Sequence, residues 1–575
     1  MGNPTVIYPN KGHYNITADL PKRKDFSWEE IESNFSWSST GKVNMAHECA
    51  DRHVDEGFGE KVALHYIGES EEYKLTYSEL KEKSDQWATV LKKHGVKKGD
   101  FVFVFLPKHP DCHIAMLAAI KLGAIVGPLF EAFMEDAVKE RIYDCEATFL
   151  VASPELLKRV PRKELPSLTT VFITAELEQC LDDEVSLFAE VRNIEVEENI
   201  TEWVDLDHGL NIHYTSGSTG KPKGIIHAHR AMIQQYITGR WVLDLKEDDI
   251  YWCTAHPGWV TGTVYGVFAP LLNRTTTVIH GGRFSAEEWY DVLERTGVNV
   301  WYSAPTAFRM IMAEGEELSS NYDLSKIRHI LSVGEPLNPE VIRWGIRVLS
   351  NRIHDTWWMT ETGAQLIVNL PSDVIKPGSM GKPFPGIEAA ILGDRGESLE
   401  NGAIGQLALK ANWPAIMREV WKDPAKYSTY FPFEGWYLSG DLATLDEEGY
   451  VFFQGRSDDM INSSGERIGP FEVESKLIEH PAVAEVGVIG KLDEIRGEIV
   501  KAFIVLTKDY EESEELLEEL RLFVRRGLAA HAAPREIEFI EELPKTPISG
   551  KVLRRELKAR EEKALESRHV EKVGI

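Results

Sequence analysis

A loop near the middle of the chain combines the residue types that bind a polyphosphate. Between Tyr214 and Gly224 the sequence reads YTSGSTGKPKG, with three glycines, four Ser or Thr hydroxyls and two lysines. Glycines let the backbone approach a ligand and turn its N–H groups inward, while hydroxyls and lysines add donors and positive charge. A strand-like run precedes the loop, and Ala231 to Leu245 has helical apolar spacing. A flexible Gly/Ser linker is the alternative, but linkers are seldom bracketed by regular elements, so we predict a phosphate-binding loop.

The loop does not have the spacing of a Walker A loop, in which four residues separate a glycine from Gly-Lys-Ser/Thr. Five positions beyond Gly217 stands Pro222, and five beyond Gly220 stands Ile225, so neither glycine opens that motif. The loop resembles instead the phosphate loop of the adenylate-forming superfamily, which includes acyl-CoA synthetases, luciferases and nonribosomal peptide adenylation domains. The resemblance implies that a nucleotide site is built from residues further along the chain.

Two turns beyond the loop carry small, acidic and aromatic residues. Gly334-Glu-Pro336 follows an apolar run that ends at Val333, and DTWWMTETG spans Asp355 to Gly363. A nucleotide base needs a flat apolar wall and hydrogen bonds at its edge, and such turns can provide both. Two core tryptophans are the alternative interpretation of Trp357 and Trp358, but the Thr-Glu-Thr-Gly tail also matches the superfamily.

Three charged residues complete the predicted nucleotide site. Glu361 is a carboxylate near the expected phosphates, and carboxylate plus phosphate oxygens is the usual Mg²⁺ arrangement; a surface or helix-capping glutamate is the alternative. Asp441, at the end of YLSGD, can accept hydrogen bonds from both ribose hydroxyls. Arg456 has the guanidinium geometry that suits phosphate or the ribose edge. The alternative is that Asp441 and Arg456 are ordinary turn residues. Their order along the chain, after the other motifs, favours a role in nucleotide binding.

A lysine close to the C-terminal end has a setting that favours catalysis. The sequence PKTPISGK ends at Lys551. A lysine on a glycine turn can reach a carboxylate and an α-phosphate together, and its charge would stabilise the transition state between them. A surface lysine is the alternative. The superfamily usually reads Pro-Lys-Thr-x-Ser-Gly-Lys, so this chain has one residue more before the lysine.

The elements that must position these groups alternate between strand and helix. The run Phe101 to Leu106, followed by helical spacing from His113 to Leu122, predicts parallel-sheet units. Further strand candidates end just before the motifs described above, at Cys253, Tyr302, Val333 and Asp355. Since ligands of open α/β sheets bind beyond the carboxyl ends of the strands, we expect these turns to converge on one crevice.

The pattern changes twice along the second half of the chain. Beyond Ala389, short strands between turns predict a β subdomain, and beyond Asp458 strands alternate with amphipathic helices. The predicted fold is therefore α/β and α+β. Residues 1–457 would form a large N-terminal adenylation domain of mixed and parallel sheets with a β subdomain, and residues 458–575 a small mobile α+β domain. The acidic run from Lys508 to Glu519 is interpreted as a solvated helix face.

The composition limits the possible classes of function. A length of 575 residues exceeds one core, and a formal net charge of −28 argues against nucleic acid as a partner. No secretory signal or membrane span is visible, so we expect a cytoplasmic protein. Scattered cysteines without a C-x-x-C motif predict reduced thiols and neither a disulfide nor a metal framework; they are Cys49, Cys112, Cys145, Cys180 and Cys253.

The ordered motifs together resemble the AMP-forming acyl-CoA synthetases over nearly the whole chain, and among them the acetyl-CoA synthetase (acetate–CoA ligase) branch. The marks of that branch are Trp259-Val-Thr-Gly262, Tyr302-Ser-Ala-Pro-Thr306, Val333-Gly-Glu-Pro336 and Asp355-Thr-Trp-Trp358. The resemblance implies a reaction in two steps. Acetate attacks the α-phosphate of ATP to give acetyl-adenylate and diphosphate, and the CoA thiol then attacks the adenylate to give acetyl-CoA and AMP.

The resemblance also implies roles for individual residues. Lys551, Glu361 and Lys223 would act in catalysis, with Glu361 holding Mg²⁺ beside the ATP phosphates. The residues that would bind ATP or AMP are Thr215, Ser216, Gly217, Ser218, Thr219, Gly220, Lys223, Gly334, Glu335, Pro336, Asp355, Thr356, Trp357, Trp358, Met359, Thr360, Asp441, Arg456, Arg467 and Lys551.

Other implied sites lie outside the nucleotide pocket. CoA would contact Thr261, Ser464, Gly465 and Arg525, and a second cation would lie at Ile478, His480 and Val483, partly on backbone oxygens. The family swings its C-terminal domain between the two half-reactions, which makes Asp458 the expected hinge. Lysine acetylation is a regulatory theme of the family, so an acetyltransferase and a deacetylase acting on Lys551 are candidate partners.

The acyl pocket determines which acid is used. Val260, Thr261, Val333 and Trp358 match its walls. An extra methylene normally gains about 0.8 kcal/mol on burial, but against a tryptophan wall it would clash, so we predict a preference for acetate over propionate. Three alternatives stay open: another short-chain acyl-CoA synthetase, an enzyme that loads a carrier protein, and a non-catalytic nucleotide sensor. No carrier domain is visible, and the retained charged residues of the site argue against a sensor.

Overall fold

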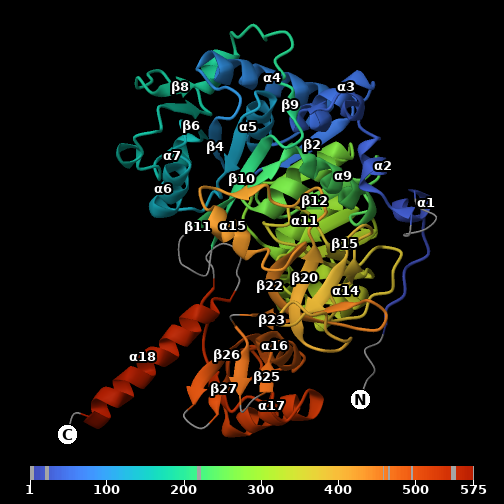
Figure 1. Ribbon diagram of the computed structural model, residues 1–575, viewed down its shortest axis with the longest axis vertical. Helices are drawn as coiled ribbons and strands as arrows, with labels where there is room; N and C mark the ends of the chain where they lie inside the picture. The colour runs from blue at the N-terminus through green and yellow to red at the C-terminus, as the bar shows by residue number, and fades with distance from the viewer. Residues whose placement is uncertain are drawn as a thin grey trace.

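The computed structural model describes residues 6–19, 25–216, 222–457, 459–463, 466–493, 496–545 and 552–573. Gly217 to Gly220, Asp458, Ser464, Gly465 and Lys551, which the sequence assigns to sites, lie outside the described residues. Figure 1 shows a large body, in blue to orange, above a small C-terminal unit in orange-red and red. This is the arrangement of a large mixed α/β domain with several sheets beside a small α+β domain, so the predicted fold class is confirmed.

An eight-stranded sheet carries the two strands that flank the phosphate loop. Strands β10 (Gly209–Ser216) and β11 (Pro222–Ala228) are antiparallel, with Thr215 opposite Lys223. The hairpin joins a parallel sheet through β10 and β5, and β11 pairs on its other side with β21. The strand order is β21 (Glu419–Val420), β11, β10, β5 (Ile125–Pro128), β4 (Phe101–Phe105), β6 (Phe149–Ala152), β7 (Thr170–Ile173), β8 (Glu184–Ser186).

A nine-stranded sheet carries the nucleotide motifs at its carboxyl edge. From β16 through β2 the neighbouring strands are parallel, and most of their residues are buried, as expected for a sheet covered on both faces. The order is β18 (Lys382–Pro383), β17 (Ile367–Val368), β16 (Ile353–Trp357), β15 (His329–Val333), β14 (Val300–Ser303), β12 (Ile250–Cys253), β13 (Thr276–His280), β2 (Val62–Ile67), β3 (Glu72–Thr76).

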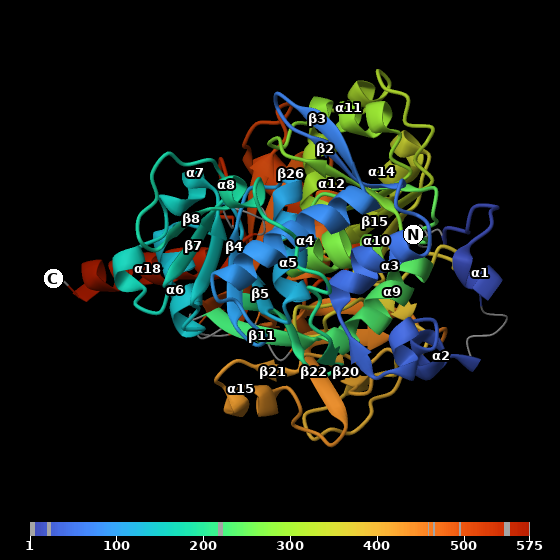
Figure 2. The same cartoon turned by 90° about the horizontal axis from the view of Figure 1, so that it is seen from above.

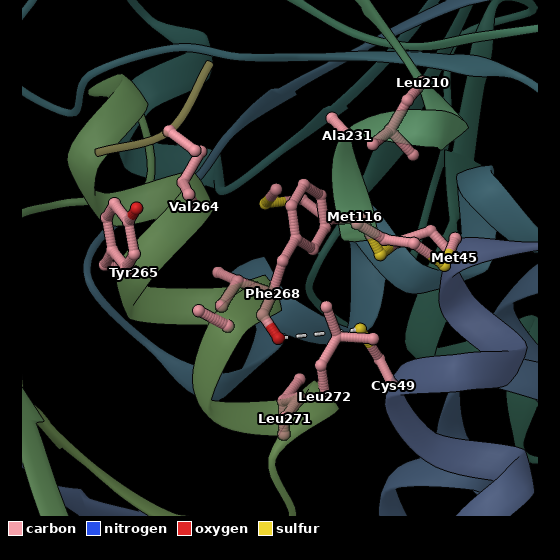
Figure 3. Packing of buried hydrophobic residues seen from close by; sticks show 14 of the residues in the cluster. Met45, Cys49, Met116, Leu210, Ala231, Val264, Tyr265, Phe268, Leu271 and Leu272 are labelled. Atoms are coloured by element: carbon pink, nitrogen blue, oxygen red, sulfur yellow. Dashed lines mark hydrogen bonds between the residues drawn. The ribbon is translucent and has the colours of Figure 1, made fainter. Parts of the chain in front are cut away.

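Helices fill the space between these two sheets (Figure 2). Helix α4 (Tyr77–Lys93) starts at a capping box between Thr76 and Glu79, and α5 (Pro110–Lys121) is buried along nearly its whole length. Figure 3 shows Met116 of α5 near Phe268, whose carbonyl accepts a hydrogen bond from the thiol of Cys49 at 3.9 Å. The helices of this layer are η3 (His47–Asp51), α3 (Arg52–Asp55), α4, α5, α9 (Met232–Trp241), η6 (Gly262–Phe268) and α10 (Ala269–Leu272).

One predicted helix is shorter than the sequence indicates. Apolar spacing predicts a helix from Ala231 to Leu245, but α9 ends at Trp241. Asp244 has a φ of +52°, a left-handed conformation that is incompatible with a continuing helix. The remaining apolar residues are buried in the turn that leads to β12, so their apolar character reflects burial and not helical structure.

Other helices and short strands cover the outer faces and edges of the large body. They are α1 (Asn15–Asp19), α2 (Trp28–Glu32), η2 (Ser36–Ser39), β1 (Lys42–Val43), α6 (Glu135–Asp144), α7 (Pro154–Leu157), η4 (Arg162–Glu164), α8 (Leu187–Val191), β9 (Val204–Asp205), η5 (His229–Ala231), α11 (Ala286–Thr296), α12 (Pro305–Ala313), α13 (Glu316–Ser319) and α14 (Pro339–Leu349).

The predicted β subdomain is a four-stranded antiparallel sheet. Its last strand begins at Val451, two residues after Gly449, whose φ of +82° places it in the preceding turn. Helix α15 (Pro424–Thr429) follows β21 and precedes the long strand β22. The strands are β19 (Ala389–Leu392), β20 (Gly405–Lys410), β22 (Trp436–Leu445) and β23 (Val451–Arg456).

The C-terminal unit has its own sheet of five strands and its own buried cluster, which includes Val473, Val488 and Leu520. Helix α17 begins at Glu514, so only the second part of the acidic run belongs to a helix. The elements are β24 (Ile461–Ser463), β25 (Glu466–Ile468), α16 (Pro470–Ile478), β26 (Val483–Asp493), β27 (Gly497–Leu506), α17 (Glu514–Gly527), β28 (Glu536–Phe539) and α18 (Arg554–Val573).

Two further expectations concern the whole chain. All five cysteines are free, and only Cys180 is exposed. Within the described ranges, no helix combines the length and apolarity needed to cross a membrane.

Candidate functional site

The turns that follow β14 and β15 meet at the carboxyl edge of the nine-stranded sheet. Gly334 has a φ of +92°, which suits glycine, and it turns the chain so that Glu335 faces α12. The Glu335 carboxylate accepts hydrogen bonds from the Thr306 hydroxyl at 2.7 and 2.8 Å and from the Arg309 guanidinium at 2.9 Å. The sequence motifs contained Thr306 but gave it no role, and nothing in them indicated Arg309. Both hold the Gly-Glu-Pro turn in place.

Three predicted nucleotide residues come together at Asp441. The Trp357 indole N–H donates to Asp441 Oδ2 at 2.8 Å, and Arg456 NH1 donates to Asp441 Oδ1 at 3.1 Å. Asp441 and Arg456 are also opposite each other in the β22–β23 ladder. The β subdomain therefore takes part in the site as well: residues of β16, β22 and β23 meet at the buried carboxylate of Asp441.

Glu361 lies on the turn after β16 and is only 6% exposed. Its Oε1 accepts a hydrogen bond from the Tyr430 hydroxyl at 3.0 Å, whereas Oε2 has no hydrogen bond with any residue in the described ranges. Gly363, with a φ of +70°, closes the turn, and a side chain there would collide with the Ala415 carbonyl. Sequence reasoning missed Tyr430, which lies 69 positions away along the chain.

The turn that carries Glu361 is suited to bind a magnesium ion. Mg²⁺ is commonly held by one or two carboxylates together with substrate phosphates, and Glu361 offers one carboxylate oxygen that is not engaged. Glu361 would hold the ion, which would neutralise phosphate charge. Within the described residues no group of three His, Cys, Asp or Glu side chains could hold a metal by itself, so phosphate oxygens would have to complete the coordination.

Trp358 is 8% exposed and stands at the predicted acyl pocket. Its ring meets that of Tyr265 on η6 edge to face, with centroids 5.2 Å apart and an interplanar angle of 80°. Val333 is also buried, and Val260 and Thr261 are partly exposed just before η6 begins. A side chain at Gly262 would collide with the His256 carbonyl, so glycine lets this turn approach the neighbouring backbone.

A hydrogen-bonded layer supports the tryptophan from behind. The Tyr265 hydroxyl accepts from the Gln365 backbone N–H at 2.8 Å, and the Gln365 side chain donates to the Tyr302 hydroxyl at 3.0 Å. Tyr302 and Thr356 share a further hydrogen bond of 2.7 Å. Tyr302 belonged to a recognised motif, but nothing in the sequence indicated Tyr265 or Gln365. This layer is buried, so it fixes the position of the ring against which Trp358 packs.

The phosphate loop is described at its two ends. Thr215 and Ser216 end β10, and Lys223 stands in β11, directly across the ladder from Thr215. No hydrogen bond or ion pair of the Lys223 side chain occurs with a described residue, which leaves its ammonium group available to a ligand. A side chain at Gly224 would lie 2.7 Å from the end of the Ile212 side chain, which would have to move to accommodate it.

Asp355 is a buried carboxyl in the nucleotide motif. Burial raises its pKa to about 8, although the backbone N–H groups of Thr356 and Leu337 act in the opposite direction. A carboxyl in an unfolded chain has a pKa of about 3.9. The folded state therefore binds the proton more tightly, and the stability gained from Asp355 is lost as the pH rises toward 8.

Asp355→Asn should flatten the pH dependence of stability. The titration of one carboxyl changes the free energy of unfolding by up to about 1.4 kcal/mol per pH unit between pH about 4 and 8, whereas an asparagine amide does not titrate. Denaturant titrations of ligand-free protein at pH 6, 7 and 8 measure the slope, with the exposed Asp394→Asn as the control. Equal slopes for wild type and Asp355→Asn would contradict the assigned protonation.

The residues predicted to bind CoA lie in two parts of the molecule: Thr261 is in the large body and Arg525 is in the C-terminal unit. The residues predicted to bind the second cation are in the C-terminal unit. Arg525 is exposed on α17, at the lower end of the C-terminal unit in Figure 1, and its side chain makes no hydrogen bond or ion pair with a described residue. His480 follows α16; its Nδ1 accepts from the Ala482 N–H at 3.2 Å, and its carbonyl accepts from the Val483 N–H at 2.9 Å. Arg467 lies in β25, opposite Asn462. A CoA site that includes both Arg525 and Thr261 would therefore span the C-terminal unit and the large body.

The chain belongs to the AMP-binding enzyme family. The model of that family matches residues 51–421, and the model of the AMP-binding enzyme C-terminal domain matches residues 472–551. The first match contains the two large sheets and the turns that form the candidate site, and the second lies within the C-terminal unit.

Individual relatives are similar over nearly the whole chain. The chain is 57% identical to "Acetyl-coenzyme A synthetase" of Bacillus subtilis (strain 168) over 550 residues, which is 96% of each chain. It is 42% identical to "Acetyl-coenzyme A synthetase" of Rubrobacter xylanophilus, over 92% of this chain and 86% of that protein.

Solved structures extend the comparison to the fold. The anthranilate CoA ligase AuaEII in complex with anthranoyl-AMP has a TM-score of 0.84 at 28% identity and covers 95% of this chain and 100% of that chain. The Brucella canis acyl-CoA synthetase has a TM-score of 0.73 at 34% identity and covers 94% of this chain and 98% of that chain.

Proposed function

We propose that the chain is an ATP-dependent acetate–CoA ligase that produces AMP, diphosphate and acetyl-CoA through an acetyl-adenylate. The observation that carries this proposal is the buried Trp358, which stands one residue from the nucleotide-site residue Trp357 and packs edge-on against Tyr265. A bulky wall beside a nucleotide site leaves room for a very short acid only. The acetyl-coenzyme A synthetases that resemble the chain over most of its length support the same reaction.

The first half-reaction joins acetate to the nucleotide. An acetate oxygen attacks the α-phosphorus of ATP, the bond to the β-phosphate breaks, and diphosphate leaves. The Glu335 turn and Trp357 would hold the base, and Asp441 would orient the ribose between Trp357 and Arg456. Lys223 and the loop ahead of it would bind the β- and γ-phosphates, and Lys551 would stabilise charge at the α-phosphate.

The second half-reaction transfers the acetyl group. The thiol sulfur of CoA attacks the acetyl carbon, the bond to AMP breaks, and the thiol proton leaves. Thr261 and Arg525 would contact CoA only after the C-terminal unit has moved, because they lie apart in this structure. Motion about Asp458 fits the change of sheet between β23, which ends at Arg456, and β24, which begins at Ile461.

Related proposals follow from the same reading. A propionate or other short-chain acyl-CoA synthetase is the second candidate, because the Trp358 wall sets only a limit on acid length. We propose a cytoplasmic location, which agrees with five free cysteines. Acetylation of Lys551 would remove its positive charge and stop adenylation, so an acetyltransferase and a deacetylase are proposed as regulators.

Diphosphate release measured with acetate, propionate and butyrate, each with and without CoA, tests the proposed function. We expect acetate to support the fastest release, propionate to be used poorly and butyrate to be inactive, with thioester formed only when CoA is present. The expected preference for acetate over propionate is roughly 10- to 200-fold, the range that one methylene gives. Equal use of the three acids would refute the assignment to acetate, and transfer only to a protein thiol would favour the carrier-loading alternative.

A further inference from the structure

Helix α15 is held against the strand that carries Lys223. Strand β21 pairs with β11, with Ile225 opposite Val420 and Ile226 opposite Glu419. The Trp421 backbone N–H then donates to the Gly224 carbonyl at 2.7 Å, directly beside Lys223. Asp423 caps the next helix through the Lys426 N–H at 2.8 Å. The chain therefore places the first turn of α15 next to the phosphate-loop hairpin (Figure 1).

The side chain of Tyr430 contacts both Lys426 on this helix and Glu361, the predicted metal ligand. The Lys426 ammonium lies 4.5 Å from the centroid of the Tyr430 ring, on the cation–π geometry that a lysine adopts over an aromatic face. The hydroxyl of the same ring donates to Glu361 Oε1 at 3.0 Å. Tyr430 in turn stacks on the fully buried Tyr437, with centroids 5.8 Å apart, which fixes its position.

Two lysines near the Glu361 carboxylate have no carboxylate partner in the part of the chain that the structure describes. Lys426 forms no ion pair with a carboxylate in the described ranges, and the same is true of Lys223. Partial burial lowers the pKa of Lys426, and the nearby positive charges of Lys223 and Arg456 lower it further, while the carboxylates of Glu361 and Asp423 act in the opposite direction. A polyphosphate ligand would neutralise the charges of Lys223 and Lys426, which no carboxylate of a described residue pairs with.

We propose that Lys426 is a further phosphate-binding residue, which contacts the β- or γ-phosphate of ATP and the diphosphate that leaves. The inference rests on the proposed function, since it takes the ligand to be a nucleoside triphosphate. It adds a cation from α15 to a site that also includes Lys223 and Glu361. Tyr430 acts as a positioning residue that orients both Lys426 and Glu361.

The experiment compares ligands that contain the two outer phosphates with one that lacks them. In Lys426→Met, we expect the KM for ATP and the inhibition constant of inorganic diphosphate to rise about tenfold, the effect of losing one charge-assisted hydrogen bond. The inhibition constant of AMP, and thioester formation from supplied acetyl-adenylate and CoA, should change less than twofold, because neither involves those phosphates. Lys426→Arg should recover most of the affinity for ATP and diphosphate.

Lys422→Met is the matched control. Lys422 lies on the same segment, but its ammonium is already engaged: it donates to the Asp144 carbonyl at 2.9 Å and to Glu146 at 2.7 Å. The proposal is overturned if Lys426→Met binds ATP and diphosphate as Lys422→Met does, or if AMP affinity falls equally. Lys426→Gln provides a second test of the lost charge if the methionine variant does not fold. Failure of wild type to release diphosphate with acetate would instead refute the proposed function.

Discussion

Replacing Trp358 by glycine should shift acid preference from acetate toward butyrate and longer acids. The indole packs against the ring of Tyr265, and its removal would leave a cavity beside that ring. Each methylene that enters the cavity gains about 0.8 kcal/mol, or roughly fourfold in kcat/KM, until the cavity is filled. Acetate is too short to fill the cavity and would no longer be held in position, so it should become a poorer substrate than butyrate.

The measurement is kcat/KM for straight-chain acids from acetate to octanoate, with diphosphate release as the readout. Trp203→Gly provides a control, because Trp203 is 43% exposed and its ring contacts His47 far from η6 along the chain. That control should keep the acid preference of wild type. If Trp358→Gly folds, binds AMP and still rejects butyrate, Trp358 does not close the acyl pocket.

Lys551→Ala should slow acetyl-adenylate formation by a factor of about 10² to 10³, while thioester formation from supplied acetyl-adenylate remains close to wild type. The lysine would act on the acetate carboxylate and the α-phosphate, which react with each other only in the first step, and removing one such electrostatic contact typically has an effect of that size. Single-turnover assays of each half-reaction separate the two steps.

Lys545→Ala is the control for the turn that holds Lys551. Lys545 pairs with Val552 across an isolated bridge, and its ammonium donates to Glu485 at 2.7 Å, so its charge is already engaged. We expect both half-reactions to survive this change. An equal loss of both half-reactions in Lys551→Ala would mean that the lysine supports the fold of the C-terminal unit and does not act in adenylation.

Local sequence patterns predicted the strands and turns that form the candidate site. The apolar runs that end at Val333 and near Asp355 are strands, and the motifs that follow them are the turns that meet at Glu335 and Trp357. Apolar periodicity and turn residues depend on neighbours a few positions away, so a single sequence contains them.

The partners across the fold could not be predicted in this way. Arg309, Tyr430 and Lys426 become relevant only because distant segments pack together, and none of them stands in a recognisable motif. The same limit applies to the end of α9. Asp244 adopts a left-handed conformation there, and the residues around it do not predict that conformation. Packing between segments separated by tens to hundreds of residues decides these features.

The strand order of the nine-stranded sheet has a consequence for how the chain is made. Strands β2 and β3 form a hairpin near the N-terminus, but the parallel neighbour of β2 is β13, with Leu64 opposite Thr277. On a ribosome that adds about 5 to 20 residues per second, β2 waits roughly 10 to 40 seconds for that partner to be synthesised. During this interval its edge presents unpaired backbone groups that invite association with other nascent chains. Chaperone demand during synthesis should therefore fall once β13 has emerged.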